Sequence, residues 1–188
     1  MKAKSPGQSA LLLLDVIQVL NKSKIPYAVI GAFAASFYGV VRASLDADVI
    51  IFFEDKTGIE QLCATFKKRK LRINYRRGDF NDPVRGVINI HDSFKNSVDL
   101  LTGIRGMSND VFGRVKKARF MGRSIKVISK EDFIAMKIFA GSPKDIQDAI
   151  GVLDVSGEKI NLSVLKKLTK GYGRAYVKTI EKIFRERL

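Results

Sequence analysis

Three aspartates that lie in or directly before apolar segments are the residues best suited to chemistry in this chain. Asp46 and Asp48 precede the apolar run 49–53, and Asp99 lies within the apolar segment 97–101. Alternate residues of a strand point to one face, so Asp46 and Asp48 are predicted to project side by side. Carboxylates that close repel one another unless a proton or a cation neutralises them. The three aspartates therefore predict a metal site.

A glycine upstream of these carboxylates, Gly31, follows the apolar segment 27–30 and precedes a predicted short helix, 32–38, closed by Gly39. Glycine tolerates the backbone angles that such a sharp strand-to-helix turn needs. The turn accounts for Gly31 by itself, and the helix after it would also present unpaired backbone N–H groups to a phosphate. Carboxylates beside a glycine turn are what magnesium-assisted transfer of a nucleotide requires.

Three further polar residues could serve such a site. Arg42 and Ser44 lie between the turn and the carboxylates, where they either form a solvated loop or contact a nucleotide. Lys137 lies in the otherwise apolar segment 133–140. Its ammonium group either extends to solvent or points toward the carboxylates, where it would offer a point charge to a triphosphate. The sequence leaves both alternatives open.

Other reactive residue types point to structural roles. His91 is the only histidine, so we expect a structural histidine and no histidine-based metal site or catalytic triad. Cys63 is the only cysteine, which excludes an internal disulfide and fits a reducing compartment. Cys63 falls on the apolar face of a predicted helix and is expected in the core.

The charge distribution favours a polyanionic partner. The net charge is +15 with a pI near 10.0, and basic residues cluster in the runs 67–77, 114–130 and 166–187. Such runs are often solvated faces, but three of them in one small protein favour a nucleic-acid backbone. Tyr172 and Tyr176 lie in the last run, where they either stack on bases or pack inward.

The pattern of apolar residues predicts an α/β (α+β) fold. Strands and helices are mixed through residue 127 and helices follow alone, so we expect a core, 1–127, with a helical carboxyl-terminal region, 128–188, packed on it. The predicted strands are 27–30, 46–53, 71–75, 87–90, 98–101 and a hairpin over 119–127 that turns at Gly122. The predicted helices are 8–23, 32–38, 56–70, 108–118, 130–140, one that begins at Ser142, 162–170 and 174–187.

No segment has the roughly 18 consecutive apolar residues that a membrane-spanning helix needs. We therefore expect a cytoplasmic protein with no membrane partner.

On these residues, the chain resembles the nucleotidyltransferase superfamily, whose fold is shared with DNA polymerase β, and within it the AbiEii-type, MenT-like toxin branch. The resemblance covers roughly 25–153. Its elements are Gly31, YGVVR at 38–42, SLDAD at 44–48, DPVRG at 82–86, Asp99 in VDLL, and the segment 127–153. Each element is weak alone, and their combination and order carry the resemblance.

The resemblance implies Mg²⁺-dependent transfer of a nucleoside monophosphate from an NTP to a hydroxyl. Asp46 and Asp48 would hold two Mg²⁺ ions, while Asp99 would complete the second site and help to deprotonate the acceptor. The implied nucleotide-binding residues are Gly31, Ala32, Ser36, Arg42, Ser44 and Lys137, and the implied supporting residues are Lys144, Asp145 and Asp148. RNA, and tRNA in particular, is the expected acceptor, and a toxin-type protein would have an antitoxin partner.

One position departs from the family pattern. The turn glycine is usually followed by serine or glycine, whereas this chain has Ala32. The backbone N–H remains, and Ser36 or Ser44 could supply the missing hydroxyl. Two alternatives stay open: a small-molecule or protein nucleotidyltransferase, and a nucleic-acid-binding module without catalysis.

Overall fold

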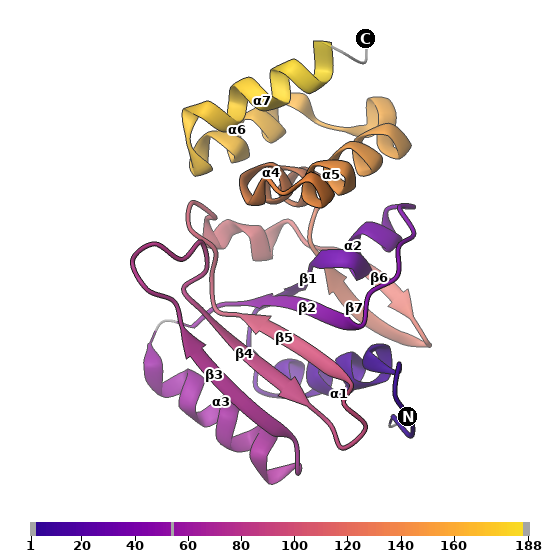
Figure 1. The fold of residues 1–188 in the computed structure, drawn as a ribbon, viewed down its shortest axis with the longest axis vertical. Helices are drawn as coiled ribbons and strands as arrows, with labels where there is room; N and C mark the ends of the chain where they lie inside the picture. Colours follow the sequence, from indigo (N-terminus) through magenta and orange to yellow (C-terminus); the bar gives the residue numbers. More distant parts are fainter. Residues whose placement is uncertain (1–2, 54, 186–188) are drawn as a thin grey trace.

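A seven-stranded mixed β-sheet forms the centre of the computed structural model, which describes residues 3–53 and 55–185 (Figure 1). The strand order is β3-β4-β5-β2-β1-β7-β6. The strands are β1 (Tyr27–Val29), β2 (Asp46–Ile51), β3 (Arg72–Arg77), β4 (Gly86–His91), β5 (Ser97–Leu101), β6 (Lys116–Phe120) and β7 (Arg123–Val127). The predicted α/β class is confirmed.

Helices flank the sheet and form the carboxyl-terminal part. They are α1 (Ser9–Lys22), α2 (Gly31–Phe37), α3 (Lys56–Lys68), α4 (Lys130–Ala140), α5 (Pro143–Ser156), α6 (Leu162–Tyr172) and α7 (Arg174–Arg185), with short 3₁₀ turns at Asn109–Gly113 and Gly157–Lys159. No helix of residues 3–53 and 55–185 is long and apolar enough to cross a membrane.

The two faces of the sheet differ in polarity. Helix α1 packs against β2 and β5, and α3 packs against β3. On β2 and β5, the residues Ala47, Val49, Val98 and Leu100 are fully buried. Because side chains alternate along a strand, Asp48 and Asp99 project from the opposite face. The strands β2 and β5 are parallel neighbours, which brings the two predicted acidic segments together.

Capping residues set the ends of the carboxyl-terminal helices. The Ser129 side chain accepts a hydrogen bond from the Asp132 N–H at the start of α4, and Ser142 does the same for α5. Gly141 ends α4 in the left-handed conformation, with φ of 70°. These caps place Lys137 on a short helix that packs directly against α5.

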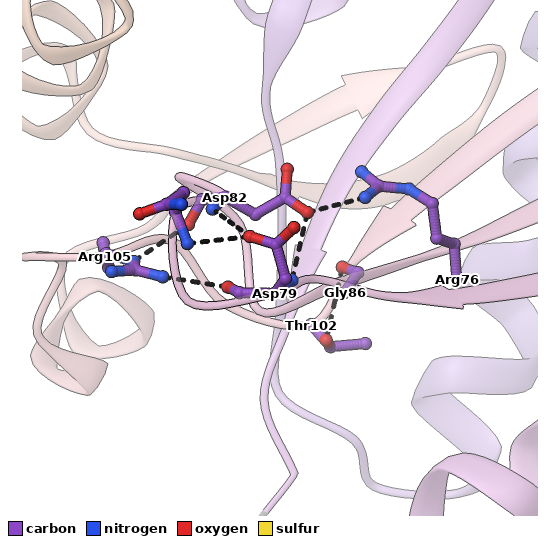
Figure 2. Close-up of polar contacts among 7 residues, drawn as sticks. Arg76, Asp79, Asp82, Gly86, Thr102 and Arg105 are labelled. Carbon is purple, nitrogen blue, oxygen red and sulfur yellow. Dashed lines mark hydrogen bonds and ion pairs between the residues drawn. The ribbon is translucent and has the colours of Figure 1, made fainter.

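A loop between β3 and β4 is held by hydrogen bonds within it and by two arginines outside it, Arg76 on β3 and Arg105 after β5 (Figure 2). Arg76 forms an ion pair with Asp82 at 2.7 Å, and the Asp79 carboxylate accepts hydrogen bonds from the Asn81 and Asp82 N–H groups. Arg105 donates to the backbone carbonyls of Asp79 and Asp82 at 3.0 and 2.8 Å. The loop is thus ordered although it consists of turn-forming residues.

Several sequence predictions need correction. The predicted helix 108–118 is wrong: only Asn109–Gly113 is helical, as a 3₁₀ turn, and β6 begins at Lys116. Pairing with β7 outweighs the local helical pattern there, since Ala118 faces the core opposite Ile125. The predicted end of the last helix, 186–187, lies outside the described residues. The division at residue 127 stays a prediction, because apolar residues on both sides of it contribute to one core.

Candidate active site

Asp48 and Asp99 occupy paired positions on adjacent parallel strands. The register of β2 and β5 places Asp46 opposite Ser97 and Asp48 opposite Asp99. Asp46 opens β2 and is exposed, whereas Asp48 and Asp99 are partly buried. The structure therefore brings Asp48 and Asp99 together across one strand pair. The third predicted carboxylate, Asp46, lies two residues before Asp48 on β2.

Gly31 lies directly against the Asp48 side chain. A Cβ atom at position 31 would be 2.0 Å from Oδ2 of Asp48, and the residue has φ of +61°. The Ile30 N–H donates to the Asp48 carbonyl at 2.9 Å, which fixes the end of β1 on β2. Both the backbone angle and the space occupied by the carboxylate thus require glycine here.

The cations near the Asp48 carboxyl group do not offset its burial and the neighbouring carboxylates. Burial raises its pKa above the usual aspartate range, and the carboxylates of Asp99 and Asp46 raise it further. Lys137 and Arg42 act in the opposite sense and do not cancel the shift. A cation beside Asp48 would therefore stabilise its ionised form.

This donor set fits Mg²⁺, which prefers carboxylate oxygens and retains several water ligands. Among residues 3–53 and 55–185, no group of three histidine, cysteine, aspartate or glutamate side chains is close enough to hold a metal as it stands. A site that uses Asp46, Asp48 and Asp99 together stays a prediction.

Asn89 orients the Asp99 carboxylate. Its Nδ2–H donates to Oδ1 of Asp99 at 2.9 Å, from the paired position on the antiparallel strand β4. One carboxylate oxygen is thereby fixed by the sheet. Asn89 was not predicted from the sequence, although a polar side chain in the alternating segment 86–91 was the available signal.

Lys137 and Arg42 form a buried ion-pair cluster with helix α5. Lys137 is 6% exposed, and its Nζ lies 2.6 Å from Asp145 and 2.8 Å from Asp148. Arg42 Nε lies 3.2 Å from Asp148. Burial acts to raise the pKa of Asp145, but hydrogen bonds from Lys137 and Ser142 outweigh it and lower that pKa. The ammonium group of Lys137 is therefore enclosed, not extended to solvent.

A cavity of about 360 Å³ lies between α2, the loop after it and the β6–β7 hairpin. Four predicted nucleotide-binding residues line it, namely Ala32, Ser36, Arg42 and Ser44. Its other lining residues are Phe33, Phe37, Ala118, Arg119, Phe120 and Ile125. The last four come from the hairpin and were not predicted, because only the tertiary fold places that hairpin beside α2.

The remaining candidates lie apart from this cluster. Lys144 is exposed on α5. Tyr172 and Tyr176 contact the ring of Phe139, with centroids 4.8 and 5.5 Å apart, so they pack inward and do not form a base-stacking surface. Cys63 packs partly buried against the core, as predicted.

The fold is that of nucleotidyltransferases, as comparison with solved structures shows. No protein-family model matches the chain, and no curated protein does. The antibiotic-resistance factor ANT(2'')-Ia aligns with a TM-score of 0.61 at 14% identity, over 95% of this chain and 97% of that chain. An antigenic nucleotidyltransferase-like protein from Paracoccidioides brasiliensis aligns with a TM-score of 0.54 at 16% identity, over 97% and 94%.

The lincosamide antibiotic adenylyltransferase LnuA, solved with lincomycin, aligns with a TM-score of 0.51 at 12% identity. That alignment covers 81% of this chain and 99% of LnuA. These similarities establish a shared fold, and fold alone does not define an acceptor.

Proposed function

We propose that this protein is a Mg²⁺-dependent nucleotidyltransferase that moves a nucleoside monophosphate from an NTP to a hydroxyl group. The observation that carries the proposal is the pairing of Asp48 with Asp99, with Gly31 against the Asp48 carboxylate. A carboxyl group whose pKa is raised by burial and by a neighbouring carboxylate, as that of Asp48 is, is typical of a cation-binding active site.

In the proposed reaction, the acceptor oxygen forms a bond to the α-phosphorus of the NTP, the bond from that phosphorus to the β-phosphate oxygen breaks, and pyrophosphate leaves. Asp99, oriented by Asn89, would accept the acceptor's proton. Asp46, Asp48 and Asp99 would hold two Mg²⁺ ions, whose positive charge stabilises the charge that develops on the phosphate oxygens.

The cationic side chains suit the triphosphate. Lys137 is fixed by Asp145 and Asp148, so it offers a positioned charge without the entropy cost of ordering a free lysine. Arg42, Ser36 and Ser44 line the adjoining cavity and supply donors where Ala32 lacks a hydroxyl. Gly31 would let the nucleotide approach the backbone closely.

RNA, and tRNA in particular, is the proposed acceptor. The net charge of +15 attracts a polyanion and repels cationic acceptors. A toxin-type role with an antitoxin partner would follow from the resemblance of the motifs described above.

The test is incubation of the protein with labelled NTPs, Mg²⁺ and total RNA. Asp99→Asn is expected to lower label incorporation by about 10²–10⁴-fold, because it removes the proton acceptor. Asp15→Asn, on α1 at the opposite face of the sheet, is the matched control and should incorporate label like the unaltered protein. Equal incorporation of label by the unaltered protein, Asp99→Asn and Asp15→Asn would overturn the proposal.

A second candidate is transfer to a small-molecule hydroxyl. It is favoured by the fold shared with the antibiotic-resistance factor ANT(2'')-Ia and the lincosamide antibiotic adenylyltransferase LnuA. Label that appears on a small molecule but not on RNA would select it. RNA binding that is unaffected by Mg²⁺ or by Asp99→Asn, with no label transferred, would instead select the non-catalytic module.

A further inference from the structure

One face of the sheet carries two aligned rows of polar residues that extend from the aspartates to the sheet edge. The first row crosses β2, β5, β4 and β3 in register and consists of Asp48, Asp99, Asn89 and Asn74. The second row lies beside it and consists of Asp46, Ser97, His91 and Arg72. The next row, Ile50, Leu101, Val87 and Arg76, is apolar except at the edge. The polar rows therefore form a strip of defined width, which we call the polar strip.

The outer part of the polar strip is accessible. Asn74 and Arg72 on β3 are exposed, and His91 and Asn89 on β4 are partly exposed. Helices α1 and α3 pack on the other face, and Figure 1 shows no described helix in front of β3, β4 and β5. In a sheet with one covered face, the uncovered face is commonly polar, but here the polar residues also lead directly from a candidate active site.

Charge changes sign along the strip. Its inner end holds Asp46, Asp48 and Asp99, and its outer end holds Arg72. Strands lie 4.7–4.9 Å apart, so β3 is about 10 Å from β5. No described ion pair engages Arg72, whereas Arg76 in the neighbouring row is paired with Asp82 at 2.7 Å. The strip thus has an acidic end and a basic end, about 10 Å apart across two strand spacings.

We infer that the polar strip binds the single-stranded 3′ end of an RNA acceptor, with the terminal ribose at Asp99 and an upstream phosphate at Arg72. This inference rests on the proposed function and specifies its acceptor surface. A ligand that fits must carry a hydroxyl at one end and a negative charge about 10 Å behind it. Terminal nucleotides of RNA have both features, and Asn74 and His91 can hydrogen-bond to ribose or base edges between them.

The test measures binding separately from transfer. Fluorescence anisotropy with a short 5′-labelled single-stranded RNA, in EDTA so that no transfer occurs, compares Arg72→Gln with Arg77→Gln. Arg77 is the matched control: it is exposed on the same edge strand and carries the same charge, but it projects from the opposite face. Both residues lie at the sheet edge, so both variants should fold.

Arg72→Gln is expected to weaken binding about tenfold, as the loss of one charge-assisted hydrogen bond to phosphate does. It should also lower the slope of log affinity against log salt by about one. Arg77→Gln should change affinity by less than about twofold. Equal effects of the two substitutions would overturn the inference, because a general basic surface would then explain the binding.

A second measurement uses His91, whose imidazole is the only one in the chain. Its NMR signals should shift when RNA is added to the unaltered protein, and unchanged signals at saturating RNA would overturn the inference.

The experiments distinguish failure of this inference from failure of the proposed function. If RNA affinity depends on Arg72 but no label is transferred in Mg²⁺, only the proposed reaction is overturned. If label is transferred to RNA and Arg72→Gln does not change RNA affinity, only the inference about the polar strip is overturned.

Discussion

Two acidic clusters in this molecule differ in whether their charges are paired. In the β3–β4 loop, Asp79 and Asp82 are satisfied by backbone N–H groups and Arg76, and the hydrogen bond from Arg76 lowers the pKa of Asp82 (Figure 2). On β2 and β5, Asp48 and Asp99 face each other, and burial with mutual repulsion raises the pKa of Asp48.

We interpret this difference as the one between a structural role for the loop acids and the functional role proposed for the strand acids. The loop acids have partners within the protein, so they hold a turn and require nothing more. Asp48 is partly buried, and nearby cations do not offset the burial and the carboxylates that raise its pKa, so a bound cation would stabilise its ionised form. Acidic residues are thus informative about function when the fold leaves them without partners.

The largest effect on stability is expected from the cations that border the strand acids. Lys137→Met would leave Asp145 and the buried Asp148 without their ammonium partner. The free energy of unfolding should fall by about 3 kcal/mol, as for other broken buried ion pairs. Urea denaturation provides the measurement. The control, Lys166→Met, breaks a half-exposed pair with Glu181 and should cost less than about 1 kcal/mol. Equal losses would contradict the distinction between the two pairs.

Substitution of the glycine against Asp48 should have the next largest effect. Gly31→Ala combines left-handed strain with a clash on the carboxylate, so we expect a loss of about 2–3 kcal/mol and at least a tenfold loss of transfer. Gly122→Ala has a similar φ of +77° but no neighbour within 4 Å, and should cost only about 1 kcal/mol with unchanged transfer. If the two variants behaved alike, close packing on Asp48 would have no functional consequence.

A smaller effect is expected from the residue that orients Asp99. Asn89→Ala should lower kcat about tenfold and leave KM for the NTP within about twofold, because it affects proton transfer and not nucleotide binding. Steady-state kinetics with RNA as acceptor give both constants. Asn109→Ala, at an exposed position, is the control. A change confined to KM would show that Asn89 acts in binding and does not orient Asp99.

The smallest effect is expected from substitution of Asp82 in the β3–β4 loop. Because the folded pKa of Asp82 is lowered, its stabilising contribution is present above the unfolded pKa of about 3.9 and is lost as pH falls through the folded value. Asp82→Asn should therefore melt slightly below the unaltered protein near neutral pH, and the difference should shrink as the pH falls below about 4. Transfer activity should not change. A difference independent of pH would show that the charge of Asp82 does not stabilise the loop.

Local sequence signals predicted most of the elements that position the site. Gly31, the alternation around Asp46 and Asp48, and the helix start at Ser142 each depend on a few neighbouring residues, so their consequences could be derived without the fold. The helix predicted over 108–118 was wrong because part of that segment forms β6. Pairing of β6 with β7, which comes later in the chain, overrides the local helical spacing. Asn89 and the hairpin side of the cavity were missed for the same reason: their roles depend on neighbours distant in sequence.

The sequence by itself determined that this chain forms a mixed α/β fold with aspartates in two of its strands, because hydrophobic periodicity and turn chemistry are local properties. Tertiary structure decided which of those aspartates meet. Parallel pairing of β2 with β5 sets Asp48 against Asp99, and antiparallel pairing of β4 and β3 extends that register to Asn89 and Asn74. Register between strands is fixed by burial of the opposite face against α1 and α3, a global condition that no local pattern contains.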